Sequence, residues 1–507
     1  MITAQTIVLD ALRNHFHLNE FRAPQQEIIS ALLEQHDVLA LLPTGAGKSL
    51  CYQLPATILP GTTIVVSPLL SLINDQVAKL KKLGVSAAAL TSQKSFRQQA
   101  RIRTALKKRK LKLLYLSPEK LLSKSWTEIL ASLPVSMVVV DEAHCVAMWG
   151  TDFRPAYIQI KNYCDKLRHR PIIAAFTATA TKESAQYISQ MLGLIKPKQF
   201  RLSTRKPHLQ ILVQPCYRPV DKLITLISYL EKPDRLPAII YCSTRAAVMG
   251  LKQLLQKLLL PFLPKITIAA YHGGLKTKQR ITIEQQFITN RTDILIATNA
   301  FGMGVDKPNI RTVIHWQIPA SIENFYQEIG RAGRDLKPAV SILCYLATDV
   351  TIQEKLNKKH TTAQIRDQQK LTKLVRLARS NRCINQQLEH YFGDSEHLAP
   401  CGQCSNCVST QPLTSQCFQL ARQLTRSINA INSKIPTPIC MIELLSVLQP
   451  TTYTQLLCIP GVGRGWLKKY AAITIVLSKV FQLAQLLTEN KNSTILAVVH
   501  EQTAEPS

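Results

Sequence analysis

Two segments of the sequence carry residue types that could bind and cleave a polyphosphate. Residues 43–49 read Pro-Thr-Gly-Ala-Gly-Lys-Ser, follow the apolar run 38–42 and lead into a helical pattern. Glycines let backbone N–H groups point toward phosphate oxygens, and the N-terminus of the following helix adds positive potential. We expect Lys48 to reach the β- and γ-phosphates of a nucleotide and Ser49 to ligate Mg²⁺. The other residues expected to line this phosphate-binding loop are Thr44, Gly45 and Gly47.

An acidic pair completes the expected phosphate site. Asp141 and Glu142 directly follow residues 137–140, an apolar run with the character of a buried strand. In that position Asp141 would hold the Mg²⁺ through its water shell, and Glu142 would orient and deprotonate the attacking water. The structural alternatives are an ordinary glycine-rich turn, since Leu42 stands where the strict pattern has glycine, and a polar strand end.

Four cysteines form a separate cluster with metal-ligand spacing. Cys401, Cys404 and Cys407 are each separated by two residues, and Cys383 reaches them from an upstream helix. Four thiolates make a closed, tetrahedral zinc site of the structural type, and an iron–sulfur cluster uses similar spacing. Disulfides are disfavoured because the other nine cysteines are scattered, as in a protein of a reducing compartment.

Strands that end at a common edge are needed to bring such groups together. Short β-rich apolar runs alternate with longer stretches of helical period, which is typical of a parallel sheet covered by helices. The runs are 63–66, 113–116, 137–140, 172–176, 238–241, 266–269, 294–297 and 312–315. We therefore expect an α/β fold with two tandem lobes, joined by the stretch near residues 205–219.

The same pattern predicts the division of the chain. We expect the first lobe in residues 1–205, the second in 206–345 and a helical zinc-binding subdomain in 346–409, where the strand pattern fades. Residues 410–490 read as a small helical domain and residues 491–507 as a loosely ordered tail.

The composition indicates a polyanionic partner. The chain has 62 Lys and Arg against 32 Asp and Glu, a net charge of +30, while 46% hydrophobic residues exclude a disordered polycation. Residues 408–507 hold eight basic and four acidic residues, so +26 of the charge lies in residues 1–407. No apolar run is long enough to span a membrane, and residues 1–16 lack a signal-peptide pattern. We expect a cytoplasmic protein, associated with the nucleoid if bacterial.

Over residues 15–410 the chain resembles the RecQ family of superfamily-2 DNA helicases. The resemblance implies two RecA-like lobes, ATP with Mg²⁺, a structural zinc, and movement in the 3′-to-5′ direction along single-stranded DNA. Residues 21–26 resemble the adenine-reading motif, with Gln25 the expected base contact and Arg22 its support. Further segments that resemble family motifs, in the family's order, are 67–72, 117–119, 177–180, 241–245, 271–275 and 297–308.

The last motif, residues 327–335, places two arginines three positions apart and so on one helical face. Across a cleft from the phosphate-binding loop they could neutralise charge on the transferred phosphoryl group. We expect Arg334 to be the arginine finger and Arg331 to lie at the γ-phosphate or at its neighbour. The alternative is a surface helix with salt bridges.

Residues 145–155 resemble the aromatic-rich loop that couples DNA binding to ATP hydrolysis in this family. We expect Trp149 and Phe153 to stack on bases and Arg154 to take a phosphate, and the alternative is that the two aromatics pack in the core. Where the family has Ser-Gln-Trp-Gly-His, residues 147–151 read Ala-Met-Trp-Gly-Thr. The loss of three polar groups that could relay a signal leaves the strength of this coupling open.

Two further basic segments have two interpretations each. A Pro-Gly-Val-Gly turn within residues 450–470 resembles the HRDC accessory domain of the family, in which Arg464 and Lys468 would touch the DNA backbone. The alternative is a plain helical hairpin packed on the motor, and we find no winged-helix pattern after the cysteine cluster. The basic run 101–110 either contacts DNA phosphates or, as such runs more often do, forms a solvated helix face.

The expected function is therefore that of an ATP-dependent DNA helicase in replication, recombination or repair. Its expected partners are single-stranded and tailed duplex DNA, and the sequence indicates no protein partner. Two alternatives remain: an RNA helicase, and a DNA-binding or annealing ATPase with a weakly coupled motor.

Overall fold

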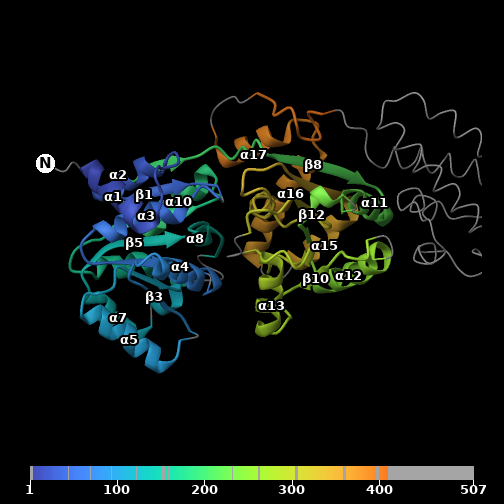
Figure 1. Ribbon diagram of the computed structural model, residues 1–507. Helices are drawn as coiled ribbons and strands as arrows, with labels where there is room; N and C mark the ends of the chain where they lie inside the picture. Colours follow the sequence, from blue (N-terminus) through green and yellow to red (C-terminus); the bar gives the residue numbers. More distant parts are fainter. Residues whose placement is uncertain are drawn as a thin grey trace, which may run out of the picture.

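The computed structural model describes residues 4–408 apart from 44, 69, 93, 122, 150–154, 158, 231, 261–262, 303–306, 358–360 and 395–398. Within these residues the chain forms two α/β lobes that lie side by side, blue to teal and green to yellow in Figure 1. A helical segment, residues 347–408, follows the second lobe and packs on it. The α/β fold with two parallel-sheet lobes, expected from the sequence, is confirmed.

The first lobe is built on a seven-stranded sheet in which every adjacent pair of strands is parallel. Its strands are β1 (Val38–Leu41), β2 (Thr62–Val66), β3 (Ala87–Leu90), β4 (Leu113–Leu116), β5 (Val135–Asp141), β6 (Ile172–Thr177) and β7 (Lys198–Arg201). Their order is β3-β4-β2-β5-β6-β1-β7. Most of these strands are buried along their whole length, because helices cover both faces of the sheet.

The helices of the first lobe alternate with its strands. They are α1 (Ala4–Phe16), α2 (Gln25–Leu33), α3 (Lys48–Ile58), α4 (Leu70–Lys82), α5 (Phe96–Lys107), α6 (Pro118–Leu121), α7 (Lys124–Ala131), α8 (His144–Trp149), α9 (Gln159–Asp165) and α10 (Lys182–Leu192), with a short 3₁₀ turn η1 (Pro155–Tyr157). Two apolar clusters, one on each face of the sheet, form the core of this lobe.

The second lobe repeats the strand order of the first. Its strands are β8 (Leu209–Cys216), β9 (Ala238–Tyr241), β10 (Ile268–Tyr271), β11 (Ile294–Ala297), β12 (Thr312–His315) and β13 (Ala339–Leu346). Numbered within each lobe, both sheets run 3-4-2-5-6-1, and the first lobe adds a seventh strand. The helices here are α11 (Pro219–Leu230), α12 (Arg245–Leu259), α13 (Thr277–Ile288) and α14 (Ile322–Ile329), with a 3₁₀ turn η2 (Pro233–Arg235).

Two details of the expected pattern are wrong. Residues 209–216, expected to belong to the connection, form β8, which pairs along its whole length with β13. The connection between the sheets is therefore residues 202–208. The strand expected at 266–269 begins at Ile268. The preceding residue, Thr267, donates from its backbone N–H and its hydroxyl to Asp293 (2.8 and 2.7 Å).

The segment after the second sheet is helical and shares its core. Its helices are α15 (Ala347–Asn357), α16 (Thr361–Arg379) and α17 (Ile384–Phe392). Leu374 of α16 and Leu388 and Phe392 of α17 lie in one apolar cluster with the strand residues Ile211 and Leu343. This segment is therefore continuous with the second lobe. No helix of the described ranges has the length and apolar character that crossing a membrane requires.

One buried carboxylate connects three parts of the first lobe. Asp37, directly before β1, is 3% exposed and accepts two hydrogen bonds from Arg170 (3.1 and 2.5 Å). It also accepts from the backbone N–H groups of Ile173 in β6 (2.9 Å) and Ile195 before β7 (2.7 Å). The side chain therefore fixes the start of the strand that leads to the phosphate-binding loop.

We expect Asp37→Ala to lower the free energy of unfolding of this lobe by about 3 kcal/mol, because it leaves the buried N–H of Ile173, the partly buried N–H of Ile195 and a guanidinium without this acceptor. Urea unfolding followed by circular dichroism measures the change. The control is Glu34→Ala, which removes a solvent-exposed ion pair with Lys198 (2.8 Å) and should change little. Equal effects of the two substitutions would contradict this role of Asp37.

Candidate nucleotide site and metal centre

A cleft of about 340 Å³ lies between the two lobes. From the first lobe it is lined by Gly45, Gly47, Lys48, Ser49, Asp141, Glu142 and His144. From the second lobe it is lined by Gly302, Gln327, Arg331 and Arg334. Residues from four separate sequence motifs therefore meet at one place.

The first wall is the loop between β1 and α3. Gly45 and Gly47 have φ angles of +93° and +77°, a region that glycine adopts without strain. A Cβ at Gly47 would lie 2.3 Å from Nε2 of Gln25, so the position also requires the absence of a side chain. Gln25 donates hydrogen bonds to the carbonyl oxygens of Ala46 (3.2 Å) and Gly47 (3.3 Å), and its own Oε1 accepts from the backbone N–H of Arg22 (2.9 Å). Gln25 and Arg22 thus lie against the loop.

The charged groups of this wall lie at the ends of α3 and β5. Lys48 begins α3, its Nζ is buried without a hydrogen-bond acceptor among the described residues, and it lies 3.6 Å from Glu142 Oε1. Burial and the neighbouring Glu142 raise the pKa of Asp141 to about 6. Burial opposes ionisation of Glu142 as well, but Lys48 and His144 outweigh it and lower the pKa of Glu142. The buried ammonium of Lys48, which lacks an acceptor, could bind a phosphate. The carboxyl of Asp141, whose pKa is raised, would be stabilised in its ionised form by a bound cation.

Glu142 has a φ angle of +51°, which is uncommon for a residue with a side chain. Its backbone N–H donates to Asp141 Oδ1 (3.0 Å), and its carboxylate lies 3.3 Å from Nδ1 of His144. Such strained positions occur where the surrounding structure holds a functional side chain in place.

The second wall is formed by the end of α14 and the residues after it. Arg331 is 8% exposed, and a Cβ on Gly302 would approach its guanidinium to 2.7 Å. Arg334 lies against the phosphate-binding loop, since a Cβ on Gly45 would be 3.9 Å from its Cγ. Both arginines expected to face the loop across a cleft therefore do so in the structure.

A further buried cation near Lys48, Arg331 and Arg334 was not anticipated from the sequence. Lys206 lies in the connection between the lobes, is 9% exposed and donates to the carbonyl oxygen of Gly330 (3.2 Å). Burial and the positive charges of Arg334, Arg331 and Lys48 lower the pKa of Lys206 to about 7. Lys206 stands between Arg205 and Pro207, and nothing in this local sequence predicts that its side chain is buried. Burial is the larger cause of this lowered pKa, and the three neighbouring positive charges add to it.

One side chain connects the two walls directly. The Gln327 amide nitrogen lies 3.0 Å from Nε2 of His144 and donates to the hydroxyl of Thr179 (3.2 Å). On its other side the His144 ring lies 3.0 Å from the Thr177 hydroxyl. This chain of polar contacts joins the acidic pair, the end of β6 and the second lobe, although residues 144, 179 and 327 belong to three distant segments.

Several expected site residues lie outside what the structure describes. These are Thr44 of the phosphate-binding loop, the side chain of Trp149, then Phe153 and Arg154 of the aromatic loop, and Arg464 and Lys468. The helical domain expected in residues 410–490 and the tail in 491–507 also lie outside the described residues.

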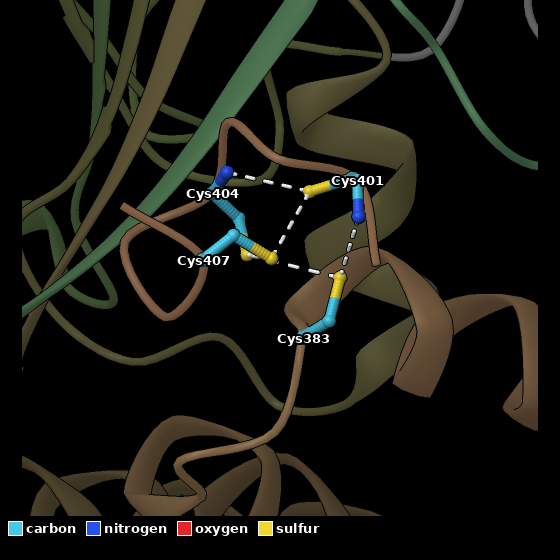
Figure 2. Close-up of side chains that lie close together, drawn as sticks. All are labelled: Cys383, Cys401, Cys404 and Cys407. Atoms are coloured by element: carbon cyan, nitrogen blue, oxygen red, sulfur yellow. Dashed lines mark hydrogen bonds between the residues drawn. The ribbon is translucent and has the colours of Figure 1, made fainter. Parts of the chain in front are cut away.

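Four thiols meet at the start of α17, in the helical segment after the second lobe. Figure 2 shows Cys383 approaching Cys401, Cys404 and Cys407 from the helix side, and the four Sγ atoms lie within 4.8 Å of one another. The Sγ–Sγ distances include 3.4 Å (Cys404–Cys407), 3.8 Å (Cys401–Cys407) and 3.9 Å (Cys383–Cys404). Four thiolates at about 2.3 Å from one zinc ion would be about 3.8 Å apart. The spacing is too wide for disulfides and fits one tetrahedral ion.

Backbone N–H groups surround this cluster. The N–H of Cys401 donates to the sulfur of Cys383 (3.3 Å), and the N–H of Cys404 donates to that of Cys401 (3.3 Å). Ile384 donates in the same way to the sulfur of Cys404 (3.4 Å). Such hydrogen bonds orient metal-binding thiolates and stabilise their negative charge.

The cysteine-bearing segment also holds the connection between the lobes. Arg205 pairs with Glu389 of α17 (2.7 Å), and Asp394 accepts from the backbone N–H and hydroxyl of Thr204 (3.0 and 3.1 Å). Arg201, at the end of β7, donates to the carbonyl oxygen of Phe392. Order in the cysteine cluster therefore bears on how the two lobes are joined.

Comparison with known families matches three consecutive parts of the chain. Residues 22–187 match the DEAD/DEAH box helicase family, residues 220–335 the helicase conserved C-terminal domain, and residues 347–408 the RecQ zinc-binding family. The two lobes are thus RecA-like helicase lobes.

Comparison with whole proteins agrees with these matches. The chain is 36% identical over 409 residues to the ATP-dependent DNA helicase RecQ of Haemophilus influenzae, a match that covers 80% of this chain and 64% of that protein. It is 43% identical over 354 residues to the probable ATP-dependent DNA helicase RecS of Bacillus subtilis, covering 69% of each. The solved structure of the DUF1998 helicase MrfA bound to DNA and AMPPNP has the same fold, with a TM-score of 0.58 and 19% identity over 69% of this chain and 52% of that one.

The cysteine cluster yields a direct test. We expect Cys404→Ser to lower the zinc content of the purified protein and its solubility, because the buried Cys404 sulfur would be lost from a four-ligand site. Atomic emission measures the metal, and Cys164→Ser, a buried cysteine of the first lobe, is the matched control. Unchanged zinc stoichiometry in Cys404→Ser would contradict the assignment of the site.

Proposed function

The chain belongs to the RecQ family of helicases, and from that premise we propose that it is an ATP-dependent DNA helicase. It moves along single-stranded DNA and separates duplex DNA in replication, recombination or repair. The observation that carries this proposal is the cleft between the lobes, where the phosphate-binding loop faces Arg331 and Arg334. The chain covers 64% and 63% of the first two curated relatives, so their activity is proposed for it rather than transferred.

The residues of the cleft divide the work of ATP hydrolysis between the lobes. The loop of residues 43–49 and Lys48 hold the phosphates, and Gln25 with Arg22 lies where an adenine-reading segment must meet the loop. Glu142, kept ionised by Lys48, accepts a proton from the attacking water. Arg331 and Arg334 neutralise the charge that develops on the transferred phosphoryl group.

Two metals belong to this proposal. Mg²⁺ bound by Ser49 and Asp141 would neutralise charge on the phosphate oxygens during transfer. The four cysteines hold zinc rather than an iron–sulfur cluster, because their sulfur atoms are spaced for one tetrahedral ion. The zinc has a structural role, since all four of its positions are taken by protein ligands.

The second substrate, single-stranded DNA, follows a path over both lobes. Because the two sheets share one strand order, β2 and β4 of the first lobe correspond in position to β9 and β11 of the second. All four strands end in polar segments: 67–68, 117–119, 242–245 and 298–299. Polar groups and helix N-termini at such strand ends can bind successive phosphates. DNA is favoured over RNA because curated relatives that share a third or more of their residues with this chain are named DNA helicases.

Gln327 is the residue we assign to communication between nucleotide and DNA. It belongs to the second lobe and contacts His144 beside Glu142 and Thr179 beyond β6. Movement of the second lobe during hydrolysis therefore alters the surroundings of the acidic pair. The second candidate function is a weakly coupled ATPase. It is considered because the family's polar pattern is replaced by Ala147, Met148 and Thr151.

We expect Lys48→Ala to reduce DNA-stimulated ATP hydrolysis by about 100-fold or more and to abolish strand displacement, because the phosphates lose their principal cation. The assay is displacement of a labelled strand from a 3′-tailed duplex, with hydrolysis measured in parallel. The matched control is Lys166→Ala, an exposed lysine of the same lobe. Unwinding that survives Lys48→Ala would refute the mechanism.

The same assay separates the competing functions. Stimulation of hydrolysis by single-stranded RNA above that by DNA of equal length would favour an RNA helicase. Stimulation by DNA without strand displacement would favour the weakly coupled ATPase. Displacement that requires both ATP and a 3′ tail is the result expected for the proposed helicase.

A further inference from the structure

The positive charge of the first lobe is concentrated in one stretch of chain. Residues 76–118 contain twelve Lys and Arg and no Asp or Glu. This stretch comprises most of α4, then β3, α5 and β4. Its excess of twelve charges is a large part of the +30 of the whole chain. A run of this size attracts polyanions unless acidic groups neutralise it, and the nearest acidic residues in sequence, Asp75 and Glu119, lie just outside its two ends.

This stretch lies at one edge of the first sheet. β3 is the edge strand, and its carboxyl end leads through residues 91–95 into α5. Because β3 pairs in parallel with β4, the start of α5 lies at the same edge of the sheet as the polar ends of β4 and β2. If the proposed DNA path over the ends of β2 and β4 continues past the edge strand β3, it reaches the start of α5.

An exposed aromatic side chain stands at this point. Phe96, the first residue of α5, is 81% exposed. It is held by a capping box, in which Ser95 accepts from the backbone N–H of Gln98 (3.3 Å) and the Gln98 side chain accepts from that of Ser95 (3.0 Å). In addition, Gln99 donates to the carbonyl oxygen of Lys94 (2.9 Å) and accepts from the Trp126 indole (3.2 Å). The backbone that carries Phe96 is therefore well fixed, although its ring contacts solvent.

The basic residues of α5 fall into groups with different physical roles. Lys107 to Lys110 stand at the C-terminal end of the helix, where the helix dipole favours cations, so their charge has a structural explanation. Arg103 lies over the Trp126 ring at 4.9 Å and also needs no other partner. These residues fit the interpretation of the run 101–110 as a solvated or packed helix face.

Arg97 and Arg101 lack such an explanation. Arg97 is the second residue of α5, where the dipole disfavours a cation, and the first turn holds no acidic residue. Arg97 and Arg101 are four apart and so share a helix face, both are exposed, and neither has an acidic partner among the described residues. Two unpaired guanidiniums beside a fixed, exposed aromatic ring match the combination that binds unpaired nucleic acid.

We propose that Phe96, Arg97 and Arg101 form a contact for single-stranded DNA that extends the path of the motor beyond the edge of the first sheet. Phe96 stacks on a base, and the two arginines pair with phosphates. An unpaired strand is the occupant because its base faces are free, whereas a duplex keeps them stacked inside. This inference rests on the proposed function, which supplies DNA as the partner.

The test compares the full chain with the triple variant Phe96→Ala/Arg97→Gln/Arg101→Gln. Fluorescence anisotropy with a labelled 30-nucleotide single strand, repeated over a series of salt concentrations, should show affinity weaker by about tenfold or more. The salt dependence, log K against log salt, should fall in slope by about 1.4, because two cations are lost at about 0.7 each. Affinity for a blunt duplex of the same length, and ATP hydrolysis without DNA, should be unchanged.

A matched control removes two cations and one aromatic from elsewhere on the first lobe. Lys166→Gln/Arg168→Gln/Tyr187→Ala alters two exposed cations before the amino end of β6, at the opposite edge of the sheet, and an exposed ring on α10. This variant should bind the single strand like the unaltered protein. The proposal is overturned if the first variant also binds normally, if the control loses as much affinity, or if affinity for the duplex falls equally.

Experiment can distinguish failure of the proposed contact on α5 from failure of the proposed helicase function. If the unaltered protein shows DNA-stimulated hydrolysis and the Phe96 variant binds single strands normally, only the contact on α5 is wrong. If the unaltered protein shows no stimulation by DNA, the proposed helicase function itself is contradicted.

Discussion

The concentration of buried positive charge between the two lobes is the constraint on which the rest of the structure depends. Lys48 lies on one side, Arg331 and Arg334 lie on the other, and Lys206 lies in the connection. Burial, together with the positive charges of the other three, lowers the pKa of Lys206 to about 7. Three carboxylates, Asp75, Asp141 and Glu142, line the described part of the cleft. Mutual repulsion of the cations opposes close approach of the lobes, and a polyphosphate relieves it. The same groups can therefore bind a nucleotide and make the approach of the lobes depend on it.

This arrangement requires that both walls be held firmly. The first wall is held by β1, whose start is fixed by Asp37, and by Gln25 against the loop backbone. The second lobe shares its core with the cysteine-bearing segment, which also holds the connection through Arg205 and Glu389. The cysteine-bearing segment, far along the sequence from the first wall, therefore contacts the connection between the two walls of the cleft.

Much of the fold and of the site could be predicted from the sequence, because the signals are local. Fully buried strands such as β4 and β11 are continuous apolar runs in the sequence, and the loop before Lys48 has a composition that few other structures require. β8 is an edge strand with alternating burial that contains Pro215, so its residues form no continuous apolar run and resemble a connection. The burial of Lys206 and the contact of Gln327 with His144 could not be predicted, since both depend on how the second lobe packs against the first.

The central claim is that one nucleotide is bound by both lobes together. The most direct measurement is calorimetric titration of a non-hydrolysable ATP analogue with Mg²⁺ into the unaltered protein and into an Arg331→Gln/Arg334→Gln variant. If the second lobe supplies a wall of the site, the variant should bind the analogue about tenfold or more weakly while its thermal stability stays close to that of the unaltered protein. Equal affinity in the two proteins would mean that the first lobe holds the nucleotide alone, and would contradict the account.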